Sequence, residues 1–105
     1  MAVVTSTDQD FAAQLAENNL VVVKYYADWC GACRLFSPKF KKMADDPRFA
    51  GIQFLDVNAE TSPEARKLAG VSNLPFFATF KNGHLVKGDF TAKPEAVEAM
   101  IAEIL

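Results

Sequence analysis

The two cysteines of the chain stand three positions apart, in the segment Cys30-Gly31-Ala32-Cys33. We expect this segment to follow a buried strand and to open a helix, where free backbone N–H groups and the helix dipole favour a negative charge. A thiolate at Cys30 would be stabilised there and would be nucleophilic near neutral pH. Because the second sulfur lies one helical turn away, the pair can cycle between a dithiol and a disulfide. The spacing therefore predicts thiol–disulfide exchange, in which Cys30 attacks, a mixed disulfide forms and Cys33 resolves it.

Trp29 and Gly31 are placed to support this chemistry. Trp29 offers a flat apolar surface beside the sulfur, and Gly31 lets the backbone of a partner approach closely. Zinc binding is one alternative use of the cysteines. A structural zinc site usually has four Cys or His ligands, whereas this chain has only the two cysteines and one histidine, His84. The other alternative is a pair without turnover, which is less common than catalysis for reactive pairs in intracellular proteins. We therefore expect redox chemistry and no metal.

The composition argues against several other classes of function. The chain has 105 residues, of which 50% are hydrophobic, and its formal net charge is −2. Lys and Arg are scattered along the chain, so no basic stripe supports binding to nucleic acid or to an anionic membrane. No apolar run approaches the length that crosses a bilayer, and residues 1–9 carry no secretory signal. We expect one domain over residues 1–105 that acts as a monomer in the cytoplasm.

The strands that must position the cysteines can be located from their apolar runs. Segment 20–26 is nearly all apolar or aromatic and too short for a core helix, which predicts a central strand buried on both faces. The pair Asn82-Gly83 is a strong signal for a two-residue hairpin turn. Further strands are expected at 3–5, 52–58, 76–80 and 85–90.

Four helices are expected between and after these strands. The first starts at a capping box of Ser6 and Gln9 and runs through Asn18, and the second covers 30–44 with a kink at Pro38. The third is capped by Ser62 and closed by Gly70, and the fourth starts at Pro94. Strands and helices alternate first and a hairpin comes last. This order predicts an α/β fold with a central mixed β-sheet of four to five strands flanked by four helices.

Several motifs occur together in one order along the chain: Trp-Cys-Gly-x-Cys at 29–33, Pro38 after the second cysteine, Leu74-Pro75 before a strand, and Lys81-Asn82-Gly83. In this combination the chain resembles the thioredoxin family over essentially its whole length. The resemblance implies a thioredoxin fold and a protein-disulfide oxidoreductase whose redox group is the Cys30–Cys33 pair, with no organic cofactor. It also implies two kinds of partner, a thioredoxin reductase as electron donor and disulfide-containing client proteins.

The resemblance also assigns roles to residues around the cysteines. Pro75 would be a cis-proline facing the disulfide, and the backbone of Leu74 would hydrogen-bond an extended substrate peptide. Trp29 and Gly88 would line an apolar docking groove, with Gly31 and Ala32 completing the surface that substrates contact. From the residues alone, Leu74-Pro75 is a turn at the start of a strand, and Gly88 relieves crowding within its strand.

Two departures from the family lie in and beside the active-site motif. Ala32 stands where the family usually has proline, so the turn is less rigid, and we expect a reduction potential higher than that of a standard thioredoxin. Phe76 stands where threonine is common, and it either alters which peptides dock or belongs to the core. Arg34 and Asp28 flank the cysteines, and we expect both to be solvated surface residues.

A third departure concerns the charges behind the cysteines. The family normally has a buried Asp six residues before the first cysteine, whereas this chain has Lys24, and Asp56 stands where common bacterial members have Lys. We expect Lys24 and Asp56 to form a partly buried pair behind Cys33, because a facing pair is tolerated where a lone buried charge is not. Asp56 would accept the proton of Cys33, and Lys24 would favour its thiolate. The alternative is that both side chains reach solvent independently.

The function predicted from these features is reduction of protein disulfides by dithiol–disulfide exchange. A disulfide oxidant or isomerase is the alternative within enzymes, and Ala32 makes it more credible. A different alternative is a binding module that grips a partner without turnover, through Trp29, Leu74-Pro75 and Phe76.

Overall fold

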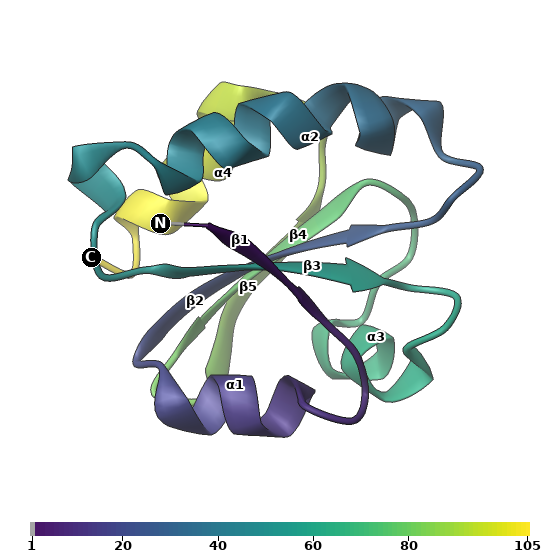
Figure 1. Ribbon diagram of the computed structural model, residues 1–105, viewed down its shortest axis with the longest axis horizontal. Coiled ribbons are helices and arrows are strands. Elements are labelled where there is room, and N and C mark those ends of the chain that lie inside the picture. The colour runs from purple at the N-terminus through teal and green to yellow at the C-terminus, as the bar shows by residue number, and fades with distance from the viewer. Residues whose placement is uncertain (1) are drawn as a thin grey trace.

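The computed structural model describes residues 2–105 and is built on one five-stranded sheet in the order β1-β3-β2-β4-β5 (Figure 1). The strands are β1 (Val3–Ser6), β2 (Leu20–Tyr26), β3 (Gln53–Asn58), β4 (Phe76–Lys81) and β5 (His84–Phe90). β1, β3 and β2 run parallel, whereas β4 and β5 are antiparallel to their neighbours. The sheet is therefore mixed, with its antiparallel hairpin at one edge, as the sequence predicts.

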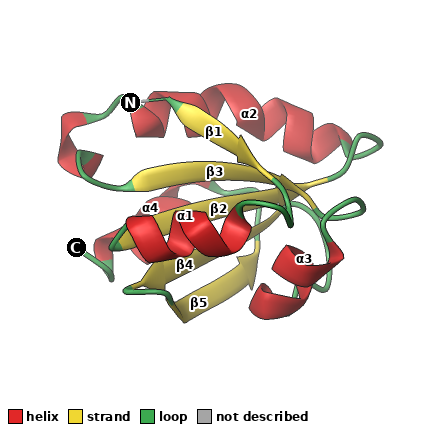
Figure 2. Cartoon of the chain, turned by 60° about the horizontal axis from the view of Figure 1, so that its bottom comes forward, coloured by secondary structure: helices red, strands yellow, loops and turns green. Residues whose placement is uncertain are grey.

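Four α-helices cover the sheet in two layers: α1 (Phe11–Glu17), α2 (Gly31–Ala44), α3 (Pro63–Ala69) and α4 (Pro94–Ala102). α2 and α4 lie on one face of the sheet, and α1 and α3 lie on the other (Figures 1 and 2). A short 3₁₀ turn, Pro47–Phe49, follows α2, and α2 itself continues through Pro38. This is the α/β architecture expected from the order of the elements. Between residues 2 and 105, no helix is both long and apolar enough to span a membrane.

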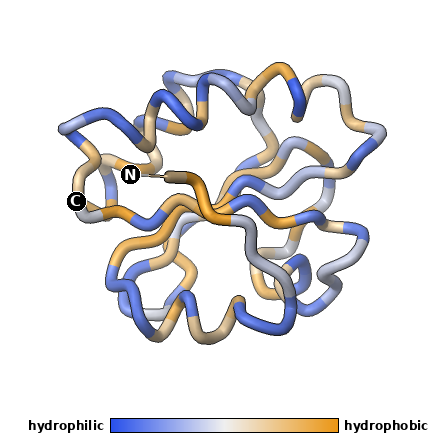
Figure 3. Tube along the Cα trace, viewed as in Figure 1, coloured by the Kyte–Doolittle hydropathy of each residue, from blue (hydrophilic) through white to orange (hydrophobic). Residues whose placement is uncertain are grey.

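The central strand β2 is buried on both faces because its side chains alternate between two apolar clusters. Val21, Val23 and Tyr25 pack on the side of α1 and α3, and Val22 packs on the side of α2 and α4. Hydrophobic residues predominate along the strands in the middle of the fold, whereas the helices contain both hydrophilic and hydrophobic stretches (Figure 3). Lys24 shares the face of Val22, and this places a cation under α2.

The start of α1 differs from the prediction. The capping box of Ser6 and Gln9 does not form, because Ser6 belongs to β1, where it pairs with Val57 of β3. Its hydroxyl donates to the carboxylate of Asp10 at 2.8 Å, and Asp10 is the N-cap residue of a helix that begins at Phe11. Strand pairing thus takes the serine out of the helix start.

The start of α3 depends on a residue from a different part of the chain. Ser62 is its N-cap residue, as predicted, but the serine side chain makes no capping hydrogen bond. Asp8 supplies the cap instead: its carboxylate accepts from the backbone N–H groups of Glu64 at 3.0 Å and of Ala65 at 2.9 Å. Gly70 ends the helix at φ 64°, a left-handed conformation that glycine adopts without strain.

The hairpin between β4 and β5 follows its sequence signal. Asn82 and Gly83 have φ values of 52° and 82°, the pair of positive values that a type I′ turn requires. The predicted turn is therefore confirmed, and each flanking strand is one residue longer than expected.

Candidate active site

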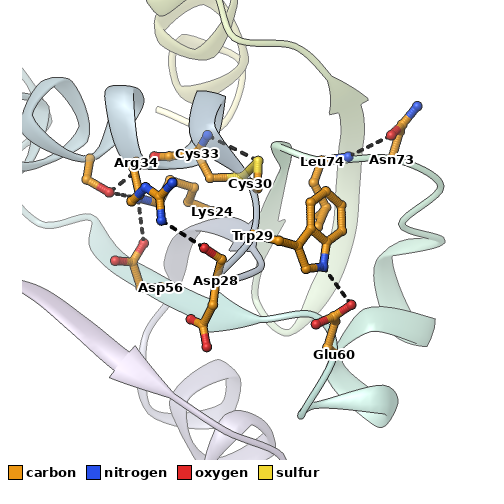
Figure 4. Close-up of a disulfide and its surroundings, with 11 residues drawn as sticks. Lys24, Asp28, Trp29, Cys30, Cys33, Arg34, Asp56, Glu60, Asn73 and Leu74 are labelled. Carbon is orange, nitrogen blue, oxygen red and sulfur yellow. Dashed lines mark hydrogen bonds and ion pairs between the residues drawn. A yellow bond between two sulfur atoms is a disulfide. The ribbon is translucent and has the colours of Figure 1, made fainter.

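Cys30 and Cys33 form a disulfide where β2 runs through a short loop into α2 (Figure 4). Cys30 is the N-cap residue, and its sulfur accepts a hydrogen bond from the backbone N–H of Cys33 at 3.2 Å. That contact and the helix dipole both stabilise negative charge on this sulfur. Cys30 is 5% exposed and Cys33 is 2% exposed, so the first cysteine is the more accessible. The predicted placement of the pair at a helix start is confirmed.

Beside the pair, Trp29 projects into solvent with 65% of its surface exposed. Its indole N–H donates to the carboxylate of Glu60 at 2.7 Å (Figure 4). The backbone N–H of Glu60 in turn donates to Asn58, the last residue of β3. The flat apolar surface is therefore present and is oriented by a carboxylate from the loop after β3. A Cβ added at Gly31 would meet no atom within 4 Å, so the space beside Trp29 at the first helical residue is open.

Leu74 and Pro75 precede β4 and are joined by a cis peptide bond. Pro75 is buried and Leu74 is half-buried. Figure 4 shows Leu74 among the residues around the disulfide, whereas the predicted position of Pro75 facing the disulfide stays a prediction. The carbonyl of Pro75 accepts from the N–H of Thr91 at 3.3 Å, and the N–H of Leu74 donates to the side chain of Asn73 at 3.1 Å. A substrate peptide that bonds Leu74 would replace this Asn73 contact.

Gly88 and Phe76 pack against each other across β5 and β4. A Cβ on Gly88 would lie 2.8 Å from a ring carbon of Phe76 and 3.4 Å from the carbonyl oxygen of Ala69. Phe76 is 6% exposed, and its ring meets Tyr25 edge-on in the core. Relief of crowding explains the glycine, and the core explains the phenylalanine. A direct role for Gly88 in substrate binding stays a prediction.

Behind the disulfide, Lys24 and Asp56 face each other across β2 and β3. Lys24 Nζ lies 3.4 Å from Asp56 Oδ1, and the lysine side chain is only 2% exposed while that of Asp56 is 25% exposed. The two side chains form the partly buried pair that the sequence predicts, and the alternative of independent solvation is wrong. Lys24 Nζ also donates to Ser37 Oγ at 2.6 Å, and Ser37 Oγ donates to the carbonyl oxygen of Cys33 at 3.2 Å.

These groups surround a cavity of about 240 Å³. It is lined by Lys24, Tyr26, Ala27, Asp28, Cys33, Arg34, Ser37 and Asp56. Arg34 and Asp28 are exposed, and the guanidinium of Arg34 donates to the backbone carbonyl of Asp28 at 3.0 Å. The buried cysteine is therefore next to a polar cavity that contains both members of the charge pair.

Burial shifts both members of the pair toward their neutral forms. Desolvation lowers the pKa of Lys24, and the negative charge of Asp56 partly opposes this shift. Desolvation raises the pKa of Asp56, and the positive charge of Lys24 partly opposes that shift. Asp56 Oδ1 is buried and accepts no hydrogen bond from residues 2–105 apart from its ion pair with Lys24. A carboxylate with a raised pKa is better matched to taking a proton from a thiol near neutral pH.

Two residues of this site, Glu60 and Ser37, are absent from the sequence-based prediction. Ser37 lies four positions after Cys33, so helical spacing could have placed both on one face. Glu60 lies in a loop and has no comparable signal. Within residues 2–105, no cluster of three or more His, Cys, Asp or Glu side chains is arranged to hold a metal ion.

Comparison with known proteins gives one consistent result. The sequence model of the family described as Thioredoxin matches residues 2–103. Thioredoxin-1 of Saccharomyces cerevisiae is 36% identical over 96 residues, which cover 91% of each chain. The crystal structure of reduced Schistosoma mansoni thioredoxin pre-protein superposes with a TM-score of 0.89 and 30% identity over 100% of both chains. Oxidized mitochondrial thioredoxin 3 of S. cerevisiae gives a TM-score of 0.86 and 26% identity over 96% of this chain and 94% of its own.

Proposed function

Since this chain belongs to the thioredoxin family and is a thiol–disulfide oxidoreductase, we propose that it reduces the disulfides of client proteins with electrons from a thioredoxin reductase. The observation that carries the proposal is the Cys30–Cys33 disulfide with Cys30 as the N-cap residue of α2. That position supplies a stabilised attacking thiolate with a second thiol within bonding reach. A disulfide oxidant, an isomerase and a binding module without turnover are less favoured, since none of them is suggested by the relatives.

The reaction has two exchange steps that start from the dithiol form. The Cys30 thiolate attacks one sulfur of the client disulfide, so a Cys30–client bond forms, the client S–S bond breaks and the first client thiolate leaves and takes a proton. The Cys33 thiolate then attacks Cys30 Sγ, which forms the Cys30–Cys33 disulfide and releases the second client thiolate. Two electrons pass to the client, and the enzyme is left oxidised. The reductase returns two electrons to the pair.

The charge pair is proposed to serve the second step. Cys33 must lose its proton before it can attack, and Asp56 borders the same cavity as Cys33. Asp56, with its raised pKa, would accept that proton, and the ammonium of Lys24 would stabilise the thiolate that remains. This arrangement would give the resolving cysteine both a proton acceptor and a nearby positive charge.

Client peptides are proposed to bind on the surface around the disulfide. Trp29 presents its exposed ring there, and the open space at Gly31 and the exposed Ala32 lets a client backbone come close. The backbone of Leu74, next to Pro75, would pair with an extended client segment. We further propose that the protein acts as a monomer in a reducing compartment such as the cytoplasm, where a reactive dithiol can be regenerated.

Insulin reduction tests the proposal. The reduced protein should precipitate insulin chains in the presence of dithiothreitol and should couple insulin reduction to NADPH oxidation through a thioredoxin reductase. The Cys30→Ser variant should do neither. A protein that reduces no insulin, yet holds its partner after both cysteines are replaced by serine, would instead be a binding module.

A further inference from the structure

Burial of the lysine stem does not by itself explain why the ammonium group of Lys24 stays inside the protein. Lysine has a long flexible stem that normally carries its charge to water when an exit exists. The cavity beside Lys24 is also lined by Arg34 and Asp28, which are exposed, so it opens to the surface. Lys24 nevertheless keeps its charge inside, with its side chain 2% exposed. Some specific contact must therefore hold the ammonium in place.

The shortest polar contact of that ammonium is with Ser37, not with Asp56. Lys24 Nζ lies 2.6 Å from Ser37 Oγ and 3.4 Å from Asp56 Oδ1. A hydroxyl can accept one hydrogen bond and donate another, and Ser37 does both, since it also donates to the carbonyl oxygen of Cys33. A hydrogen bond from a charged donor is stronger than one between neutral groups. The serine thus connects the buried cation to the helical turn that carries the resolving cysteine.

We propose that Ser37 is a positioning residue that holds the Lys24 ammonium beside the turn of Cys33 and thereby sets the ionisation of the resolving thiol. The inference rests on the proposed function, in which Cys33 attacks as a thiolate. Ser37 touches neither client nor sulfur in this arrangement and acts only through Lys24 and the backbone of Cys33. Without its hydroxyl, the ammonium would lose its short contact and would be free to move toward Asp56 or the mouth of the cavity.

Other charged and titratable groups also face Lys24 and contribute to its environment. Asp56 comes from β3, Tyr26 from β2, Asp28 from the loop before α2, and Arg34 and Lys41 from α2. Lys24 Nζ lies 5.9 Å from the ring centre of Tyr26 and 5.6 Å from that of Phe40, distances at which aromatic faces attract a cation. Ser37 differs from all of these, because it alone among the described hydrogen bonds joins Lys24 to Cys33.

The test compares three variants of the full chain: Ser37→Ala, Ser37→Thr and Ser37→Val. Threonine keeps the hydroxyl, and valine has nearly the same shape without it, so the last two separate the hydrogen bonds from packing. Ser62→Ala is the matched control, since the Ser62 hydroxyl is buried, has no hydrogen-bond partner among residues 2–105 and belongs to the start of α3, the helix on the opposite face of the sheet from α2 (Figures 1 and 2). Unfolding in urea shows that each variant is folded before its chemistry is measured.

Resolution is measured by stopped flow, with the reduced protein and one equivalent of dithionitrobenzoate. The first thionitrobenzoate is released when Cys30 attacks, and the second when Cys33 resolves the mixed disulfide. We expect Ser37→Ala and Ser37→Val to slow the second release about threefold or more at neutral pH and to move its pH midpoint upward. Ser37→Thr and Ser62→Ala should follow the wild-type pH profile.

Unchanged midpoints in folded Ser37→Ala and Ser37→Val would overturn the inference about Ser37 while leaving the proposed function intact. Equal slowing in Ser37→Thr and Ser37→Val would also overturn it, because packing rather than the hydroxyl would then be responsible. The Cys33→Ser variant tests the proposed function separately: if it releases the second thionitrobenzoate as fast as the wild type, Cys33 is not the resolving residue.

Discussion

Lys24 and Asp56 occupy facing positions on the neighbouring parallel strands β2 and β3, with Nζ and Oδ1 3.4 Å apart. The pair lies under the first turns of α2 and borders the same cavity as Cys33. The two opposite charges form a pair with no net charge, which explains why the fold accepts a lysine in the middle of its central strand.

Removing the charge of Asp56 should affect chemistry more than stability. Asp56→Asn leaves the Lys24 ammonium without its counter-charge, but it also removes a carboxylate whose ionised form is disfavoured by burial, so we expect the unfolding free energy at neutral pH to change by less than about 1 kcal/mol. Resolution by Cys33 should slow about tenfold at neutral pH through loss of the proton acceptor. Glu17→Gln, which removes an exposed carboxylate on α1, is the control. Resolution rates unchanged across pH would remove Asp56 from the mechanism.

The raised pKa of Asp56 predicts a specific pH dependence of stability. Between 3.8 and its raised folded value, Asp56 binds a proton in the folded protein but not in the unfolded chain. Acidification through the folded pKa should therefore stabilise the wild type relative to Asp56→Asn, and this advantage should be lost again as the pH rises. Urea unfolding at a series of pH values measures the difference. Two parallel stability curves would contradict the assignment.

Restoring proline in the active-site motif should make the pair more reducing. Ala32 is exposed in the first turn of α2, where proline is tolerated because its missing N–H has no partner in the helix. We expect Ala32→Pro to lower the reduction potential by about 30 mV, which corresponds to a tenfold change in the exchange equilibrium. Equilibration with glutathione buffers gives the potential. A wild-type value within or below the usual thioredoxin range would refute the proposed effect of Ala32.

A methyl group at Gly88 should be costly because Phe76 fills the space. Its Cβ would lie 2.8 Å from the aromatic ring, so Gly88→Ala should destabilise the protein by about 1–3 kcal/mol. A smaller side chain, Phe76→Leu, should recover part of that loss in the double variant, although it is destabilising alone. Unfolding free energies of the four proteins give the coupling. Additive effects would show that the ring is not what excludes the methyl group.

The long-range cap of α3 can be tested against the serine that the sequence suggests. Asp8→Ala removes both hydrogen bonds to the first turn and should cost about 1 kcal/mol. Ser62→Ala should cost much less, because the Ser62 side chain makes no capping contact. Thermal or urea unfolding of the two variants measures both losses of stability. A larger loss for Ser62→Ala than for Asp8→Ala would show that the serine, and not the aspartate, caps the helix.

Much of the fold could be predicted because it follows from local chemistry. The Asn82-Gly83 turn needs only two residues that accept positive φ, and Gly70 closes α3 for a similar reason. The placement of Cys30 at a helix start depends on the apolar strand before it and on the spacing of the pair. These features involve residues a few positions apart, whose geometry the backbone itself restricts.

The features that could not be predicted join residues far apart in the chain. Pairing of β1 with β3 decides that Ser6 is a strand residue, and the same topology brings Asp8 to the start of α3. Glu60 reaches Trp29 only because the loop after β3 ends beside the disulfide.

In the active site, residue types and spacing were enough to predict the two cysteines at a helix start and the opposite charges of Lys24 and Asp56. The meeting of these charges behind Cys33, and the link from Lys24 through Ser37 to the backbone of Cys33, are established by the tertiary structure. Residue types set which charges and donors exist, whereas strand register and the packing of α2 on the sheet set the distances between them. Electrostatic and hydrogen-bond energies depend on those distances.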